Sequence, residues 1–170
     1  MRVIWIFLAL LIYALPYNAQ AVEAASPAQD GQFNQLKIQG DFVFSNLTVA
    51  GETIITGNAR GIDSFFSNLE IGGSAKITRT NITDQLNIVG DLFVRQSNVE
   101  SLVSSGNVVI LRDSKVKKII FKESKLPQRL MLKGLDVVGD IIFESGNGLI
   151  EISNGAVVTG QVLGAVIVNN

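Results

Sequence analysis

The chain of 170 residues contains no cysteine and no histidine, and it has only 3 prolines. Without thiolates and imidazoles it cannot build most zinc, haem or iron–sulfur sites, nor a catalytic triad that uses a histidine base. Disulfides are excluded as well, so packing alone must hold a folded domain together. The sequence predicts no cofactor and no metal centre.

An excess of charge of one sign is also missing, because 14 Lys and Arg face 15 Asp and Glu. A chain with this balance has no global positive field that would attract nucleic acid. Aromatic residues make up only 7% of the chain, and base stacking needs them. We therefore do not expect a nucleic-acid partner.

The one long apolar run lies at the N-terminus. It covers residues 3–15, follows Arg2 and ends at Pro16, and Ala19-Gln20-Ala21 comes next. A run this short followed by an A-x-A pattern is typical of a signal peptide, the alternative being an uncleaved anchor. We predict a signal peptide over residues 1–24, a flexible lead-in over 25–32 and one domain over 33–170, with no transmembrane span in the mature chain. The expected location is the periplasm, the outer surface or the medium of a Gram-negative bacterium.

A nonapeptide pattern occurs three times in the rest of the chain, and short period-2 alternations of apolar residues fill the space between the copies. The pattern is apolar-x-apolar-x-Gly-Asp-apolar-x-apolar. Its copies are LKIQGDFVF (Leu36–Phe44), LNIVGDLFV (Leu86–Val94) and LDVVGDIIF (Leu135–Phe143). Alternation predicts strands, and recurrence at a nearly fixed spacing predicts a stacked repeat.

A second pattern gives the length of the repeat. It is Ser or Thr, then Asn, then an apolar residue, and it starts at Ser45, Ser67, Thr80 and Ser97, with Ser114-Lys115-Val116 as a variant. The last three starts are 17 residues apart, whereas the distance from Leu47 to Leu69 indicates an insertion. We predict an all-β, single-domain parallel β-solenoid, right-handed, with about eight coils of 16–17 residues. The competing fold is an antiparallel β-sandwich.

The repeated Gly-Asp and Asn residues are the obvious candidates for a site. Aspartates three coils apart would lie about 14 Å from each other, which is too far for a calcium site or a pair of catalytic carboxylates. We interpret them as structural corners, with Asp bonded to backbone N–H groups and Asn stacked in a ladder. Asn46 and Asn81 also match the N-glycosylation pattern. The predicted corner residues are Gly40, Asp41, Gly90, Asp91, Gly139, Asp140, Asn46, Asn68, Asn81 and Asn98.

The C-terminal third resembles a known family. Gly139-Asp140-Ile141, Ile150-Glu151-Ile152, Gly155-Ala156 and Gly160 are similar to the motifs of bactofilins, which are polymer-forming bacterial β-helical proteins. The resemblance covers residues 135–162 and implies coil geometry and end-to-end assembly. Bactofilins are generally cytoplasmic or bound to the inner face of the membrane, so this chain, with its expected export, departs from them.

Positive charge gathers between the second and third nonapeptides. The pattern is disturbed there, and Pro127 indicates a loop. A local excess of cations can bind an anionic envelope polymer or an acidic protein, the alternative being a solvated face. The residues of this basic segment are Arg112, Lys115, Lys117, Lys118, Lys122, Lys125, Arg129 and Lys133.

These features favour an exported structural or binding scaffold over an enzyme. Partners would contact its outward faces, with the basic segment as the best candidate, or copies would assemble through their open coil ends. The alternative is a polysaccharide lyase or hydrolase on a short β-helix, an analogy at the level of the fold alone.

Overall fold

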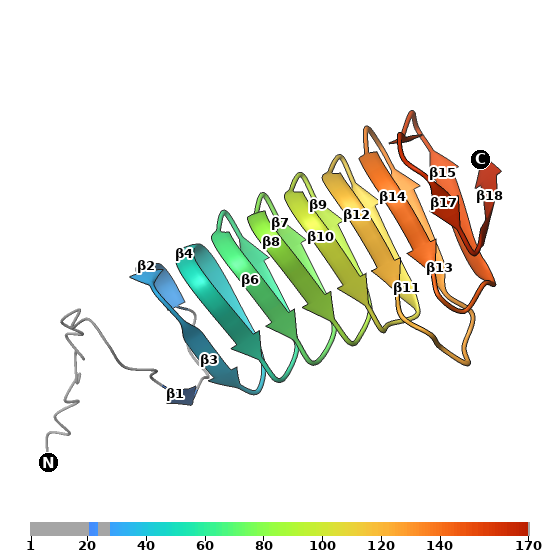
Figure 1. Cartoon of the computed structure of the whole chain (residues 1–170). Helices are drawn as coiled ribbons and strands as arrows, with labels where there is room; N and C mark the ends of the chain where they lie inside the picture. Colours follow the sequence, from blue (N-terminus) through green and yellow to red (C-terminus); the bar gives the residue numbers. More distant parts are fainter. Residues whose placement is uncertain (1–20, 24–27, 170) are drawn as a thin grey trace, which may run out of the picture.

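The computed structural model describes residues 21–23 and 28–169, which form a rod of stacked strands (Figure 1). Eighteen strands join one sheet, and the strand pairs that stack the coils are parallel. The described residues contain no helix long and apolar enough to cross a membrane. About eight coils at a strand spacing of about 4.8 Å give a rod about 40 Å long. The predicted parallel β-solenoid is therefore confirmed.

One side of the rod, which we call face A, takes one strand segment from each coil. In chain order it consists of the start of β4 (Phe42–Ile55), β5 (Ala59–Ile62), β7 (Ala75–Thr78), β9 (Leu92–Arg95), β11 (Val108–Arg112), β13 (Arg129–Lys133), β15 (Gly148–Ser153) and β18 (Ala165–Asn169).

The remaining strands form the other two sides, faces B and C. They are β1 (Ala21–Glu23), the end of β2 (Ala28–Phe33), β3 (Leu36–Gln39), the end of β4, β6 (Phe65–Ile71), β8 (Asn81–Ile88), β10 (Asn98–Ser104), β12 (Lys115–Phe121), β14 (Val137–Phe143), β16 (Val157–Val158) and β17 (Val162–Leu163). In β10 the inward residues Val99 and Leu102 are three apart, with outward Glu100 and Ser101 between them. Two successive outward residues bend the strand, so face B precedes this bend and face C follows it.

The N-terminal boundary differs in part from the predicted one. Residues 1–20 and 24–27, with most of the predicted signal peptide, lie outside the described residues. Within the described part, β1 pairs with β3 and β2 pairs with β4. The solenoid thus includes residues 28–32, which we had assigned to the lead-in.

Large and small inward side chains compensate between neighbouring coils. On face A, the buried ring of Phe44 packs against Gly61 of the neighbouring coil. A Cβ atom on Gly61 would lie 1.7 Å from this ring, so only glycine leaves room for it. Phe121 and Phe143 stack with ring centroids 4.2 Å apart. The apolar columns run the length of the rod as one core.

The corner between faces C and A, which we call corner 1, holds two of the nonapeptide Gly-Asp pairs. Asp41 Oδ1 accepts the backbone N–H of Asn58 at 2.7 Å, and Asp91 Oδ1 accepts that of Val108 at 3.1 Å. A Cβ on Gly57 in the same column would lie 2.4 Å from the backbone of Gly40. Corner 1 therefore needs glycine for close approach and a short side-chain acceptor to link the coils.

The third Gly-Asp pair lies at a different corner, so the expectation of one shared position was wrong for it. Asp140 is in register with Lys118 at the bend between faces B and C, which we call corner 3, and its Oδ1 accepts the N–H of Gln161 at 2.9 Å. The coils near the C-terminus are longer, with bonded neighbours 21 or 22 residues apart. Because these coils are longer, two residues that are 49 positions apart no longer lie at the same corner.

The four asparagines do not form one ladder. Asn46 has a positive φ of 50° at the corner between faces A and B, which we call corner 2, whereas Asn68 lies at corner 3 beside Glu52. Only Asn81 and Asn98 are in register, as the first residues of β8 and β10. The supposed insertion between Leu47 and Leu69 is absent because Thr53 is the true partner of Leu69, 16 residues away. Extra residues instead form the loop 122–128.

The hydroxyl of the Ser/Thr-Asn pattern, rather than its amide, links the coils at corner 2. Ser97 Oγ accepts the backbone N–H of Thr80 at 3.0 Å, and Ser114 Oγ accepts that of Ser97 at 3.3 Å. Each of these two hydroxyls also donates to a carbonyl two residues back. Asp136 continues the column, and its Oδ1 accepts the N–H of Ser114 at 2.8 Å.

Candidate functional site: a row of cations on face A

Face A presents one Lys or Arg without an ion pair among the described residues in each of five successive coils. Arg60 and Lys76 are neighbours in register on β5 and β7, at the middle outward position of the strand. In the next three coils the cation lies at the last outward position, one two-residue step along the strand. We call these five residues the cation row: Arg60, Lys76, Arg95, Arg112 and Lys133.

The alternation of each strand sets the direction of these side chains. In β9, Leu92 and Val94 are buried in the core, so Phe93 and Arg95 must point outward. The same alternation exposes Arg112 at the end of β11. Neighbouring coils lie about 4.8 Å apart, so the cation row is about 19 Å long and runs parallel to the rod axis.

None of the five cations forms an ion pair within the part of the chain that the structure describes. Like charges directly opposite each other in a sheet repel and destabilise it. The strands of face A carry one acidic side chain, Glu151, which pairs with Arg129. The cation row is therefore a line of positive charges without an ion pair among the described residues.

Aspartates at the two corners flank this surface. Asp113 at corner 2 accepts the N–H of Leu135 at 3.0 Å, and Asp91 is bonded at corner 1. Arg79 donates two hydrogen bonds to Asp63, at 2.6 and 2.8 Å, and these bonds lower the pKa of the Asp63 carboxyl. These carboxylates bind corner groups and lie beside the row, outside the strands.

An apolar row runs beside three of the cations. Phe93, Ile110 and Met131 are in register at the middle outward position of β9, β11 and β13, and each is half-buried. The ammonium of Lys76 lies 5.5 Å from the centroid of the Phe93 ring, within the range of a cation–π interaction. The two rows thus lie side by side over β9, β11 and β13.

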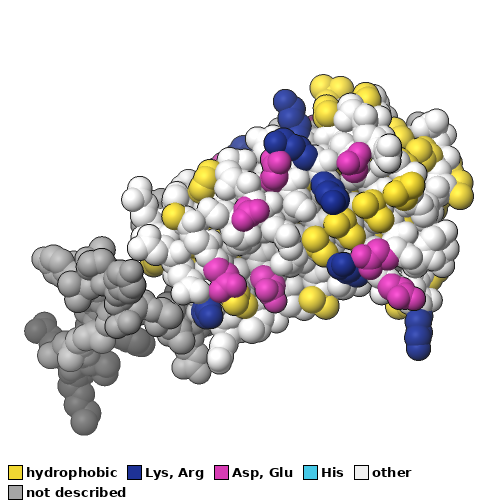
Figure 2. All heavy atoms as spheres, viewed as in Figure 1, with side chains coloured by type: hydrophobic (Ala, Val, Ile, Leu, Met, Phe, Trp, Pro, Cys, Tyr) yellow, Lys and Arg dark blue, Asp and Glu magenta, His cyan; other side chains and the backbone are white. Residues whose placement is uncertain are grey.

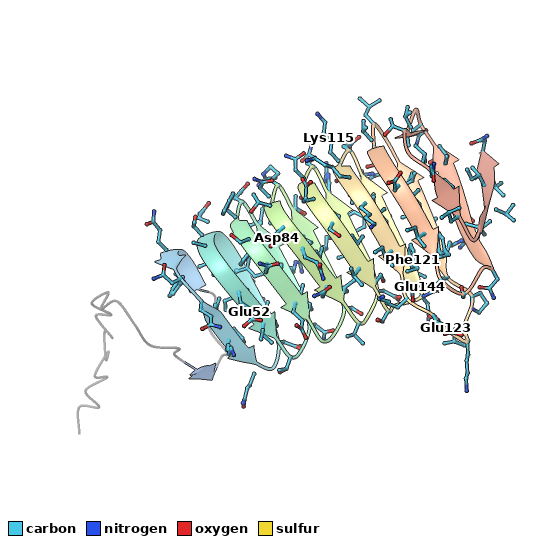
Figure 3. All side chains as sticks on the ribbon, in the orientation of Figure 1. Glu52, Asp84, Lys115, Phe121, Glu123 and Glu144 are labelled. Atoms are coloured by element: carbon cyan, nitrogen blue, oxygen red, sulfur yellow. The ribbon has the colours of Figure 1, made fainter. Side chains whose placement is uncertain are left out.

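The predicted basic segment does not form one patch, because its residues wrap around the rod. Arg112, Arg129 and Lys133 lie on face A, Lys115 and Lys117 on face B, and Lys118 and Lys122 on or beside face C, with Lys125 in the loop 122–128. Figure 3 shows Lys115 on the opposite edge of the rod from Glu123 and Glu144. A solenoid coil distributes consecutive residues over all its sides, so clustering in sequence is lost in space.

Three of these eight residues are also neutralised. Lys117 pairs with Glu100 at 2.7 Å and Lys122 with Glu144 at 2.8 Å, while Arg129 pairs with Glu151. Face A instead gains Arg60, Lys76 and Arg95, which sequence reasoning missed. The three cations each follow an inward apolar residue, and the cations of the row recur at the repeat spacing of 16–21 residues. Their alignment becomes visible only from the register of the strands.

Face B is hollowed along its length. A shallow groove of about 710 Å³ crosses five coils, between Asn81 and Thr159, and the Lys117–Glu100 pair lies within it. Its other polar groups include the amides of Asn81 and Asn98, the ammonium of Lys115 and the carboxylate of Asp140. The groove therefore carries mixed polarity and no uncompensated row.

Face C differs from face A in its outward residues. Its first half bears Glu52 and Glu70, and its second half an in-register apolar row of Val103, Ile120 and Ile142. In the view of Figure 2, acidic groups are scattered over both the early and the late coils, and a row of hydrophobic groups crosses the C-terminal half of the rod. The described residues contain no group of three acidic side chains that could hold a metal ion.

The last strand that the structure describes carries exposed apolar side chains. In β18, which pairs with β15, Val166 is 67% exposed and Val168 41%. The prediction that coil ends mediate self-association concerns this edge.

Comparison with protein-family models, with curated proteins and with solved structures found no match for this chain. The resemblance to bactofilins stays a prediction.

Proposed function

We propose that the protein is an exported scaffold that binds a linear anionic polymer along face A. The N-terminal apolar run and A-x-A pattern support the export, and the fold supports the scaffold. The observation that carries the binding is the cation row, in which each of five successive coils has one Lys or Arg that forms no ion pair with the described residues.

A row of this kind suits a polymer better than a small anion. Each cation is exposed or half-exposed, and a single surface ion pair contributes only about 0–1 kcal/mol. A linear ligand that reaches all five cations adds these contributions without repeating the loss of translational freedom. Affinity is therefore expected to rise with ligand length and to fall steeply with salt.

The test compares two triple substitutions of equal charge. Arg95→Gln/Arg112→Gln/Lys133→Gln removes three members of the cation row, and Lys115→Gln/Lys118→Gln/Lys125→Gln removes three exposed cations from other sides of the rod. None of the six forms an ion pair among the described residues. We expect at least about tenfold weaker binding to polyanions for the first variant and a small change for the second.

The proposal fails if the two variants lose affinity equally, because net charge rather than the row would then explain binding. It also fails if the wild type retains no polyanion at low salt. Circular dichroism of both variants checks that the solenoid remains folded.

A second candidate function is end-to-end self-association, which the exposed apolar edge of β18 favours. An open edge with apolar side chains and unpaired backbone groups can pair with a strand of another copy. Light scattering after size exclusion is expected to show oligomers that Val166→Lys/Val168→Lys abolishes. A wild-type monomer at high concentration would contradict this candidate.

A further inference from the structure

The two rows on face A combine into a repeating array. Phe93 and Arg95 lie two residues apart on β9, Ile110 and Arg112 occupy the same places on β11, and Met131 and Lys133 occupy them on β13. Each coil therefore offers one apolar side chain and one cation, about 7 Å apart along the strand, and the pair recurs about every 4.8 Å along the axis.

We propose that these three pairs are equivalent subsites for consecutive sugar residues of a polyuronate, an acidic polysaccharide that carries one carboxylate on each ring. This inference rests on the proposed function and names the chemical class of its ligand. In each subsite the apolar side chain contacts the C–H face of the pyranose ring, and the cation pairs with the ring's carboxylate.

The charges match this ligand in kind. Arg95 and Arg112 present guanidinium groups, which bind carboxylates through two parallel hydrogen bonds. Lys133 supplies a point charge at the third subsite. The coil spacing is close to the length that one pyranose adds to an extended polysaccharide, so one ring per coil keeps ligand and protein in phase.

The array has defined ends. Toward the C-terminus, Glu151 occupies the position that follows Met131 in register, so a carboxylate stands where the next apolar contact would be. Toward the N-terminus, Lys76 takes the middle position and lies against the Phe93 ring. Three full subsites are thus flanked by Lys76 and Arg60, which can contact one or two further carboxylates.

Other polyanions fit the array less well. Duplex DNA carries about one charge per 1.7 Å of axis, roughly three per coil, against one cation per coil here. Single-stranded nucleic acids need several stacking platforms, whereas Phe93 is the one aromatic side chain in the apolar row. Polyphosphate has no apolar face. An anionic membrane favours protruding apolar side chains, but those of this row are half-buried.

Calorimetry on the purified protein with oligogalacturonides of one to six residues tests the inference without any substitution. The affinity is expected to rise steeply up to three residues and to level off by five. Polyphosphate of matched charge, neutral dextran and phosphatidylglycerol vesicles are the comparison probes, each expected to bind more weakly at equal salt.

The variant Phe93→Thr/Ile110→Thr/Met131→Thr separates apolar contact from charge. It keeps every cation and a strand-favouring residue at each position. Its matched control is Val103→Thr/Ile120→Thr/Ile142→Thr, three half-buried apolar residues in register on face C. We expect at least about tenfold weaker oligogalacturonide binding for the face A variant and unchanged binding for the control.

Each alternative result has a distinct meaning. Stronger binding of polyphosphate or of vesicles, or no effect of the face A variant, overturns the polyuronate subsites and leaves the proposed polyanion function standing. Binding of no polyanion at all overturns both. If the face A variant fails to fold, the length series on the wild type still decides, because affinity independent of ligand length contradicts the array.

Discussion

Faces A and C are built by the same coils around the same core, yet they present opposite surfaces. Their inward residues are of the same kind, since Val94 on face A and Ile88 on face C are both apolar and fully or almost fully buried. Their outward residues differ, with unpaired cations on one face and carboxylates and an apolar row on the other. Inward columns therefore determine the rod, and outward columns are free to determine what it binds. The predictions below test this separation.

The largest loss of stability is expected when an inward residue is replaced in a strand that also carries a residue of the cation row. Leu111 is fully buried between Ile110 and Arg112. Leu111→Asp places an unpaired carboxylate in the core, and we expect a loss of at least about 4 kcal/mol, or an unfolded protein. Chemical denaturation followed by circular dichroism measures this loss.

The neighbouring substitution Ile110→Asp is the control, since its side chain points outward. It is expected to cost less than about 1 kcal/mol. Equal costs for the two variants would contradict the separation of inward from outward columns.

A smaller loss of stability is expected where a large inward side chain of one coil packs against a small one of the next coil. Gly61→Ala puts a methyl group against the Phe44 ring, and overpacking of this kind costs about 1–3 kcal/mol. The second substitution Phe44→Leu should recover part of the loss, as a double-mutant cycle by thermal unfolding would show. Independent effects of the two substitutions would mean that the columns do not interlock between coils.

The corner 2 column predicts a pH dependence. Asp136 is fully buried and its Oδ2 has no hydrogen-bond partner, so desolvation raises the pKa of this carboxyl from 3.8 to about 6. The N–H groups of Ser114 and Lys133 and the charge of Arg112 oppose this rise, while Asp113 adds to it. Because the folded state holds this proton more tightly than the unfolded chain, the contribution of Asp136 to stability is greatest below about pH 4. That contribution falls by about 2–3 kcal/mol as the pH rises from about 4 through 6, and it then levels off.

Asp136→Asn removes the titrating group, so we expect its unfolding free energy to lack this fall between pH 4 and 7. Asp140→Asn, which changes an exposed aspartate at corner 3, is the control and should keep it. An unchanged pH profile in Asp136→Asn would contradict the assignment.

The smallest expected effect concerns corner 1. Asp91→Ala removes the acceptor for the Val108 N–H, which should cost about 1 kcal/mol. Asp91→Asn keeps an acceptor oxygen and should cost less. Equal unfolding free energies for the two variants, measured in urea, would show that the side-chain link is unimportant.

The sequence predicted the solenoid because the alternation of inward and outward residues is visible within each strand. The glycines that mark the corners can also be recognised from a few neighbouring residues. It located the Gly-Asp corners of Asp41 and Asp91 but not that of Asp140, since coil length changes after Phe121 and shifts the phase. It missed the cation row for a different reason. Arg60, Lys76 and Arg95 are far apart in the chain, and only the register of neighbouring coils brings them into line.

The most direct test of the central claim is a map of the contact surface by nuclear magnetic resonance, with amide and side-chain shifts followed as an oligogalacturonide or another short polyanion is added. We expect shifts that concentrate on β5, β7, β9, β11 and β13, with Arg95 and Arg112 the most affected and the face C row of Val103, Ile120 and Ile142 unchanged. Shifts centred on face C, on the groove of face B or on β18, with the cation row unaffected, would contradict it.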